Sequence, residues 1–510
     1  MTRLFANLKL FQAAEFLVML ALAFVIPFHW LAAQYGEVAL VTCAVLKVVF
    51  EQKFKLNPSQ MRWKWVYLVF MATWLVYLIG MFYTENADEG WFQVSKKLGF
   101  LFFPLVFLIS DMSYLTKDRI RAVFYAFAAG CIAFFLMNLS AVIIGIIAAG
   151  GEWSIEHFFY WNLLCLYPVN HIYIAMYCVF AIAFLVNEIF YVSDIRLKIM
   201  DVISVVILML FVVLADSRAG LLCLVFVVVM VWLWLTFVIK NRKAGTIIAA
   251  IILILTVVTL TSVPRITYRI RQTITDISSE KSSDHRIVQM KGYSELLREC
   301  WAFGVGTGDR TDETLVSYMR YKEHIVNQIK RSYDCHLPDE EFVIRRQEFV
   351  NDVLALAKQA TNYEIHENIF KYLHKAKNHE MIDIESASKV LPELQFIQYA
   401  IDYTINAHNQ FFETLISGGV IAVLQMLAMF VIPIVIMYRK RVFDMVFVAF
   451  LLIIGINAMF ESVFEGQVGI IFFNFFCMLL LTALVTDKSL SVKVMNEKTG
   501  NLMIDKMKDK

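Results

Sequence analysis

Residues 221–239 read LLCLVFVVVMVWLWLTFVI and carry no charged side chain. An apolar run of this length can cross the roughly 30 Å hydrocarbon core of a membrane as one helix. Hydrophobic residues make up 59% of the whole chain. A soluble domain cannot bury that much apolar surface, so the sequence predicts a polytopic membrane protein.

Other apolar stretches of the chain are candidates to cross the membrane in the same way. We expect an all-α fold of about twelve transmembrane helices, with a large helical periplasmic loop between the ninth and the tenth. Leu98–Ile109 is short for a crossing, so we expect it to be tilted, extended by its flanks or broken. The predicted crossings are Leu10–Trp30, Val38–Phe50, Trp65–Phe82, Leu98–Ile109, Val123–Ala149, His171–Phe190, Val202–Ala215, Leu221–Ile239, Ala249–Val263, Phe411–Met437, Phe443–Phe460 and Val468–Val485.

Basic side chains gather in alternate connections between these stretches. Because cytoplasmic loops are enriched in Lys and Arg, both termini are predicted in the cytoplasm and the long polar segment outside it. The predicted parts are nine transmembrane helices in residues 1–263, a periplasmic loop or helical cap in 264–407, three helices in 408–485 and a cytoplasmic tail in 486–510. The basic clusters are Lys53/Lys55/Arg62/Lys64, Lys117/Arg119/Arg121, Arg196/Lys198, Lys240/Arg242/Lys243 and Arg439/Lys440/Arg441.

Three basic residues break this pattern on the outer side, namely Lys96, Lys97 and Arg218. A cation at the outer membrane boundary needs an anion to hold it, and lipid phosphate or pyrophosphate is the obvious candidate. The alternative for the two lysines is that they reach ordinary lipid headgroups. The outer connections without Lys or Arg are Ala32–Glu37, Gly150–Asn170 and Glu461–Gln467.

Charge and cysteine content exclude several classes of function. The net charge of +2 is too small to indicate nucleic-acid binding, because topology accounts for the basic clusters.

The first apolar run is followed by further spans and not by a small-residue cleavage site, so we expect a signal anchor. Cys300 and Cys335 both lie in the outer loop, where they form either a disulfide or two free thiols. No metal-ligand spacing is present, and no metal site is expected.

The long loop divides into two parts. Its first part, residues 265–309, is rich in arginine and ends in Phe303-Gly-Val-Gly-Thr-Gly-Asp309. This run resembles a dinucleotide fingerprint, but no βαβ unit precedes it, so we interpret it as a structural turn. From about residue 311 to 397, hydrophobic residues recur at helical spacing, which predicts a helical cap that either shapes a substrate site or serves as a scaffold.

Three short elements carry a resemblance to a known family. Asp216-Ser217-Arg218-Ala219-Gly220-Leu221-Leu222 contains Arg-x-x-x-Leu, Arg286 precedes the glycine turn, and His408-Asn409 is followed by nine residues and Gly419. In these places the chain resembles the O-antigen ligase and polymerase superfamily of polytopic membrane glycosyltransferases. The resemblance extends over most of the chain, because the family's layout of twelve helices with one large periplasmic loop is reproduced.

The resemblance implies an O-antigen ligase-like enzyme of the bacterial inner membrane. Such an enzyme moves a glycan from a polyprenyl (undecaprenyl) pyrophosphate donor to an acceptor sugar such as lipid A-core at the periplasmic face. The same superfamily includes O-antigen and exopolysaccharide polymerases and protein O-oligosaccharyltransferases, which remain alternatives. We expect no cofactor, and a reaction independent of metal and nucleotide. The expected partners are the two glycan substrates and membrane lipids, with no nucleic acid.

The chemistry of this transfer assigns roles to basic side chains. A pyrophosphate leaves readily once fixed cations stabilise its charge, and the forked, permanently charged guanidinium suits that task. We expect Arg218 and Arg286, with Arg269 or Arg271, to bind the pyrophosphate. An imidazole titrates near neutral pH, so His408 is predicted to accept the proton of the acceptor hydroxyl. Without the resemblance, a structural interfacial histidine or helix cap would be the simpler interpretation.

Other polar residues near the same boundary are weaker candidates for substrate contact. His171 and Tyr173 line the cavity or anchor the helix at the interface. Glu413 orients a sugar or forms a hydrogen bond within the bundle. Glu461 and Glu465 contact the acceptor, or one or both are merely solvated. The candidates of this weaker group are Lys97, His171, Tyr173, Asn409, Glu413 and Glu461.

A transporter of lipid-linked oligosaccharides is the alternative from another class. A chain with about twelve spans is compatible with a transporter, and its binding cavity would be similar to that of the glycosyltransferase. Internal inverted repeats are not visible in the sequence, and most of the polar content lies on one side of the membrane. We therefore favour the glycosyltransferase.

Overall fold

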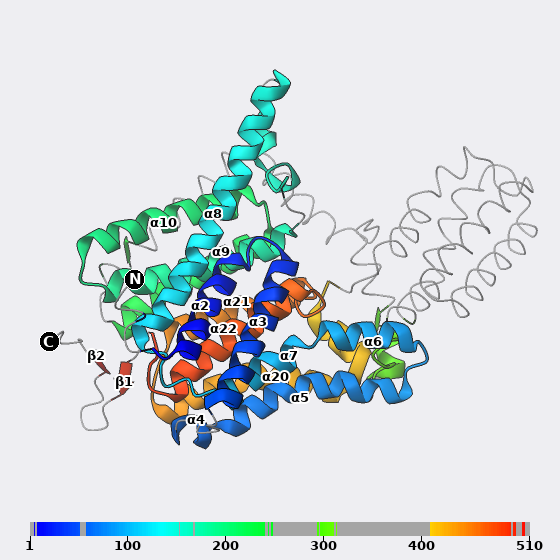
Figure 1. The fold of residues 1–510 in the computed structure, drawn as a ribbon. Coiled ribbons are helices and arrows are strands. Elements are labelled where there is room, and N and C mark those ends of the chain that lie inside the picture. Colours follow the sequence, from blue (N-terminus) through cyan, green and yellow to red (C-terminus); the bar gives the residue numbers. More distant parts are fainter. Residues whose placement is uncertain are drawn as a thin grey trace, which may run out of the picture. The chain divides into compact units, whose positions relative to one another are not determined.

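The structure is a computed structural model of the 510-residue chain. It describes residues 5, 8–51, 58–151, 153–166, 169–239, 243, 246–247, 293–294, 296–310, 313, 408–490, 493–495 and 502–504. The α-helices in chain order (Figure 1) are α2 (Leu10–Val25), α3 (Trp30–Glu51), α4 (Pro58–Arg62), α5 (Lys64–Gly80), α6 (Ala87–Lys96), α7 (Gly99–Ile109), α8 (Lys117–Ala149), α9 (His171–Tyr191), α10 (Ile195–Leu214), α11 (Arg218–Leu233), α20 (Gln410–Lys440), α21 (Met445–Phe460) and α22 (Gln467–Val485).

Short elements complete the described chain. Three 3-10 helices, Met81–Tyr83, Ile155–Phe158 and Tyr160–Asn162, lie in connections, and a π-helical turn, Trp234–Val238, extends α11. Two strands, β1 (Lys493–Met495) and β2 (Leu502–Ile504), pair antiparallel with Val494 opposite Met503. The prediction of the tail did not include this ribbon.

The protein is an all-α multi-pass membrane protein, as predicted. Among the described residues, nine helical segments are long and apolar enough to cross a membrane, and two shorter apolar helices, α2 and α21, accompany them. Every predicted crossing corresponds to a described helix except Ala249–Val263, which lies outside the described residues. The short fourth crossing is both extended and broken, because α6 and α7 form one apolar segment, Ala87–Ile109, interrupted at Lys97 and Leu98.

One predicted boundary was wrong. The first crossing was expected to continue to Trp30, but α2 ends at Val25 and α3 begins at Trp30. Pro27 explains the early end, because proline has no N–H to continue the helix ladder. The expected connection Ala32–Glu37 therefore lies inside α3, and Glu37 is buried beside Gly99 of α7.

The described chain forms two compact units. Unit 1 comprises Met1–Trp74, Lys96–Ile270 and Gln425–Lys510, and unit 2 comprises Leu75–Ser95 and Arg271–Leu424. The core of unit 1 is built on α9 and α22, in which almost every residue is buried. Helices that are hydrophobic on all sides belong in such a position. Aromatic side chains fill the contacts between them, and the ring centres of Phe127 and Phe476 lie 4.7 Å apart.

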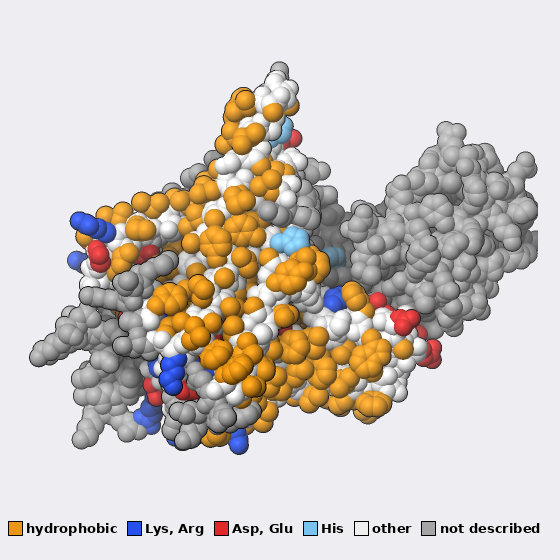
Figure 2. Space-filling view, in the orientation of Figure 1, with side chains coloured by type: hydrophobic (Ala, Val, Ile, Leu, Met, Phe, Trp, Pro, Cys, Tyr) orange, Lys and Arg blue, Asp and Glu red, His pale blue; other side chains and the backbone are white. Residues whose placement is uncertain are grey.

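The surface of the described chain is suited to lipid. Hydrophobic side chains cover most of the described surface on the face drawn in Figure 2. Exposed examples are Val49 of α3, Ile147 of α8 and Val206 of α10, each at least 60% exposed. Soluble monomers rarely expose continuous apolar areas of this kind, so these faces are placed to contact acyl chains.

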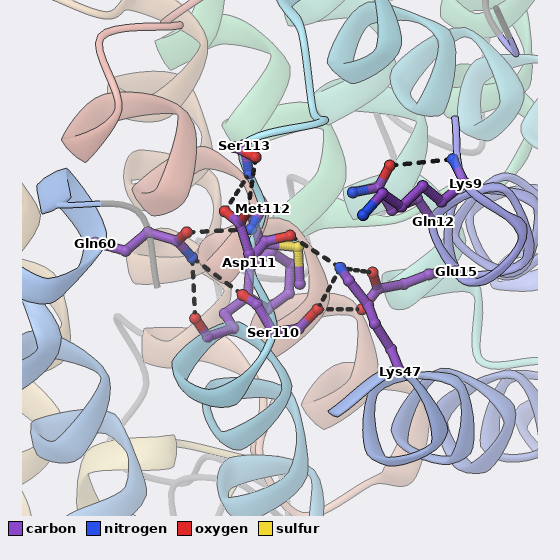
Figure 3. A network of polar contacts seen from close by, with 10 residues as sticks. Lys9, Gln12, Glu15, Lys47, Gln60, Ser110, Asp111, Met112 and Ser113 are labelled. Atoms are coloured by element: carbon purple, nitrogen blue, oxygen red, sulfur yellow. Dashed lines mark hydrogen bonds and ion pairs between the residues drawn. The ribbon is translucent and has the colours of Figure 1, made fainter. Parts of the chain in front are cut away.

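A buried polar network joins four helices at one end of unit 1 (Figure 3). The Lys47 ammonium of α3 lies 2.9 Å from the Glu15 carboxylate of α2 and donates to the Ser110 hydroxyl and the Asp111 carbonyl beyond α7. Gln60 of α4 accepts a hydrogen bond from the Met112 amide. A charge buried in a membrane protein needs such partners, and this network ties the ends of the helices together.

Polar contacts join the segments at one end of unit 1. Lys488 donates to the Ser113 carbonyl, and Lys440 donates to the Leu484 carbonyl near the end of α22. Arg121 of α8 lies 3.0 Å from Glu188 of α9 at the same end. We call this the basic end of unit 1, and the other the loop end, which carries Lys97, His171, Arg218 and Glu461.

Candidate functional site

The loop end of unit 1 brings together the first turns of α9 and α11 and the last turn of α21. A Cβ atom at Gly220 of α11 would lie only 2.3 Å from the Cβ of Ala175 in α9, so glycine permits the close approach of the two helices. The Asn457 side chain of α21 donates to the Cys223 sulfur of α11 at 3.1 Å. His171, Arg218 and Glu461 therefore stand at the same ends of neighbouring helices.

Arg218 is the first residue of α11 and is exposed. Ser217 caps this helix, and its hydroxyl accepts a hydrogen bond from the Gly220 amide at 3.1 Å. Asp216 turns the chain before the cap with a φ of 52°, in the left-handed region that non-glycine residues rarely adopt. The amino end of a helix carries a partial positive charge, so a cation there is unfavourable unless an anion joins it. The amino end of the helix and the guanidinium together form a favourable binding site for a phosphate group.

Lys97 is held by protein groups. Its side chain is 0% exposed, its ammonium lies 2.8 Å from the Glu465 carboxylate, and it donates to the Phe464 carbonyl. A lysine that reaches lipid headgroups must be exposed at its tip. The headgroup interpretation is therefore wrong for Lys97, and the anion that holds it is Glu465, which was considered from the sequence only as a contact for the acceptor or a solvated side chain.

His171 and Tyr173 begin α9 at the same end. Asn170 caps the helix by accepting from the Ile172 amide, and the His171 ring packs edge-on against Tyr160, whose φ is 57°. The Tyr173 hydroxyl is buried and points to the carbonyls of Ser462 and Val463, at 3.4 and 3.5 Å. Tyr173 therefore anchors α9 to the connection between α21 and α22.

Glu461 is a buried carboxylate at the loop end of unit 1. It follows the last residue of α21, its side chain is buried, and it interacts electrostatically with the Tyr173 phenol, as does Glu465. The interpretation of Glu461 as a merely solvated side chain is therefore wrong.

Unit 2 contains the other predicted elements. His408 has a φ of 46°, again in the left-handed region. Asn409 caps α20, because its side-chain oxygen Oδ1 accepts hydrogen bonds from the amides of Phe411 and Phe412 at 2.9 and 3.1 Å. Such backbone conformations persist where the surroundings enforce them and are frequent at functional sites. His408 thus directly precedes a capped helix, and the capping role that was the alternative interpretation of His408 belongs to Asn409.

Glu413, in the first turn of α20, forms an ion pair with Arg310. Both side chains are buried, with 3% of the Glu413 side chain and 8% of the Arg310 side chain exposed. The partner of Glu413 is therefore a residue of the long loop, whereas the hydrogen bond considered from the sequence was one within the helix bundle. Arg310 was missed, because nothing in the sequence distinguishes it from the other arginines of the loop except its place directly after the glycine run.

The glycine run is a structural turn, as predicted, and it docks on α20. Gly419 breaks that helix with a φ of 66°, which exposes carbonyl groups to other partners. The amides of Val305 and Gly306 donate to the carbonyls of Ile416 and Ser417 at 2.7 and 3.3 Å. A Cβ atom at Gly304 would lie 2.6 Å from the amide nitrogen of Gly418, so only glycine fits.

Asp309 fastens the end of this turn to the segment after α5. Its carboxylate accepts three hydrogen bonds from the amides of Glu85 and Asn86, at 2.7 to 3.0 Å. The Thr307 hydroxyl donates to the Tyr77 carbonyl at 2.7 Å. The turn therefore connects the end of α5 with the first half of α20 inside unit 2.

Several predicted features lie outside the described residues. Arg269, Arg271 and Arg286 are among them, as is Cys335. Cys300 is a free thiol, and burial raises its pKa to about 11, so it is largely protonated at neutral pH. Within the described part of the chain, no three His, Cys, Asp or Glu side chains are grouped so as to hold a metal ion.

Comparison with known proteins agrees with the resemblance drawn from the sequence. The family model described as O-antigen ligase matches residues 203–336. This region includes Arg218 and the glycine turn, whereas His408 lies beyond it. No curated protein matches the chain. The matched region, together with the multi-pass all-α fold, supports the resemblance of the chain to the O-antigen ligase/polymerase superfamily of membrane glycosyltransferases.

Proposed function

We propose that the chain moves a glycan from a polyprenyl pyrophosphate, such as undecaprenyl pyrophosphate, to an acceptor sugar such as lipid A-core. The reaction takes place at the periplasmic face of the bacterial inner membrane, with both termini of the chain in the cytoplasm. The observation that carries the proposal is the exposed Arg218 at the amino end of α11, within the region matched by the O-antigen ligase family. A guanidinium at this position supports binding of the negatively charged pyrophosphate leaving group.

In the proposed reaction the acceptor hydroxyl attacks the anomeric carbon of the donor sugar. The new carbon–oxygen bond forms as the bond to the pyrophosphate oxygen breaks, and the electron pair leaves with the pyrophosphate. Arg218 stabilises this charge, joined by Arg286 and by Arg269 or Arg271. His408 accepts the hydroxyl proton. No step needs a nucleotide or a metal ion, because the energy of transfer resides in the pyrophosphate linkage.

Sugar recognition is assigned to the weaker candidates. His171, Tyr173 and Glu461 stand at the loop end of unit 1, where Arg218 also lies, and this supports a role near the donor glycan. Lys97 acts through Glu465, its buried partner, and shapes this end without touching substrate.

Deletion of the gene, followed by analysis of surface glycans, tests the proposal. A ligase predicts lipid A-core without attached polymer, together with lipid-linked polymer that accumulates in the inner membrane. A single repeat on the core would instead identify a polymerase. Unchanged glycans would contradict both. Complementation with the wild-type gene, and with a variant changed at Arg218, shows whether the phenotype depends on the proposed chemistry.

A further inference from the structure

Unit 2 holds an ion pair that the proposed reaction does not itself use. The Arg310 guanidinium comes from the end of the docked glycine turn, and the Glu413 carboxylate from the first turn of α20. Both groups are buried, and a buried pair gains little stability over well-packed apolar residues of the same size. A buried pair is better suited to fixing one arrangement of two segments.

The pair acts on the segment that carries His408. The Glu413 amide donates to the Asn409 carbonyl at 3.1 Å, and the Ser417 hydroxyl donates to the Glu413 carbonyl at 2.9 Å. Glu413 is therefore connected through the first turn of α20 to the residue that follows His408. Because Gly419 interrupts the helix, this first part of α20 depends on contacts from other segments for its position.

The docked turn supplies those contacts, and hydrogen bonds to neighbouring segments hold the turn itself in place. Asp309, the neighbour of Arg310, is held by amides of the segment after α5, and Val305 is bonded to Ile416. Arg310 thus links the anchored turn to the beginning of α20, so the position of the turn sets the position of the helix start. An error of about 1 Å in the placement of a reacting group can lower turnover by about 100-fold.

We infer that the Arg310–Glu413 ion pair positions His408 for proton transfer. This inference rests on the proposed function, in which His408 is the base. Arg310 and Glu413 are positioning residues, and neither touches the reacting atoms.

Three variants test the inference in purified protein with a defined lipid-linked donor and acceptor. Arg310→Met and Glu413→Gln each remove one partner, and the double variant removes both. Each single variant is expected to lower kcat by about 10–100-fold with the donor KM within about twofold of wild type, because placement fails while donor binding persists. The double variant leaves no uncompensated charge, so its kcat should lie above that of either single variant.

Glu15→Gln is the matched control. It removes one partner of the buried Lys47–Glu15 pair at the basic end of unit 1. Its thermal unfolding temperature should fall as those of the single variants do, while its kcat stays at the wild-type value. Folded single variants with wild-type kcat would overturn the inference, as would a double variant whose losses simply add. If His408→Ala is fully active in the same assay, the proposed base fails; if it is inactive while the pair variants are normal, only the positioning role fails.

Discussion

The ammonium of Lys97 lies 2.8 Å from the carboxylate of Glu465, and both side chains are buried at the loop end of unit 1. Lys97 occupies the break between α6 and α7, and Glu465 lies in the connection before α22. The pair therefore fixes the start of α7 to the last pair of helices. A cation that works against the expected membrane orientation is tolerated here because a protein carboxylate compensates it.

Removal of one partner of this pair should destabilise the fold. Lys97→Met leaves the Glu465 carboxylate buried without its cation, which is expected to lower the free energy of unfolding by about 3–5 kcal/mol. Thermal unfolding in detergent measures the effect. The double variant Lys97→Met/Glu465→Gln should recover most of the loss. A single variant as stable as wild type would show that the pair is not compensating a buried charge.

Arg218→Lys separates the shape of the cation from its charge. The ammonium keeps the charge but loses the two parallel donors that match a phosphate, so we expect a substantial loss of transfer activity. Because Arg218 is exposed, insertion and thermal stability should stay unchanged. The measurement is turnover with a lipid-linked donor, normalised to folded protein. Near-wild-type transfer would mean that the pyrophosphate binds elsewhere.

Gly304→Ala should undock the glycine turn from α20. The position has a φ of 74°, and a Cβ atom would meet backbone at 2.6 Å, so we expect a loss of stability of at least about 1–3 kcal/mol. Turnover should fall as well, because the turn carries Arg310. Gly145→Ala is the matched control, since a Cβ there meets nothing within 4 Å and lies inside α8. Equal behaviour of the two variants would contradict the docking role.

Labelling of introduced cysteines tests the orientation in the membrane. Trp153 and Ile195 are both exposed, at 64% and 65%, and lie in connections predicted on opposite sides. In a cysteine-free background, Trp153→Cys should react with an impermeant maleimide in intact spheroplasts, whereas Ile195→Cys should react only after lysis. A cysteine placed in residues 264–407 should behave like Trp153→Cys, and one at Lys493 like Ile195→Cys. The reverse pattern would invert the orientation and remove the periplasmic site.

The crossings were predictable from sequence because each one is a long apolar run. A membrane-spanning helix is one of the few structures in which such a run satisfies all its backbone hydrogen bonds. Boundaries were less predictable where polar residues lie inside a helix. The expected connection Ala32–Glu37 belongs to α3, where Glu37 is buried against another helix. Only tertiary packing decides whether such a residue ends a helix or is covered by a neighbour.

The site was predictable where a residue type is unusual for its place, as with Arg218 on the outer side and His408 beside an apolar span. Its ion pairs were not predictable. Glu465 and Arg310 find their partners, Lys97 and Glu413, far along the chain. Residue type and local spacing contain no information on such pairing, because it arises from the contact of segments separated in sequence.

The turnover of His408→Ala tests the central claim most directly. If His408 accepts the acceptor proton, the variant should lose about 10²–10⁴-fold in kcat, the range usual for general-base catalysis, while donor binding stays nearly intact. His157→Ala, a change at a histidine of the outer connection that has no role in the proposed reaction, is the control and should turn over normally. The assay uses purified protein, defined lipid-linked donor and acceptor, excess chelator and no nucleotide. Full activity of His408→Ala would contradict the assignment of the base, and a strict need for added metal would contradict the proposed chemistry.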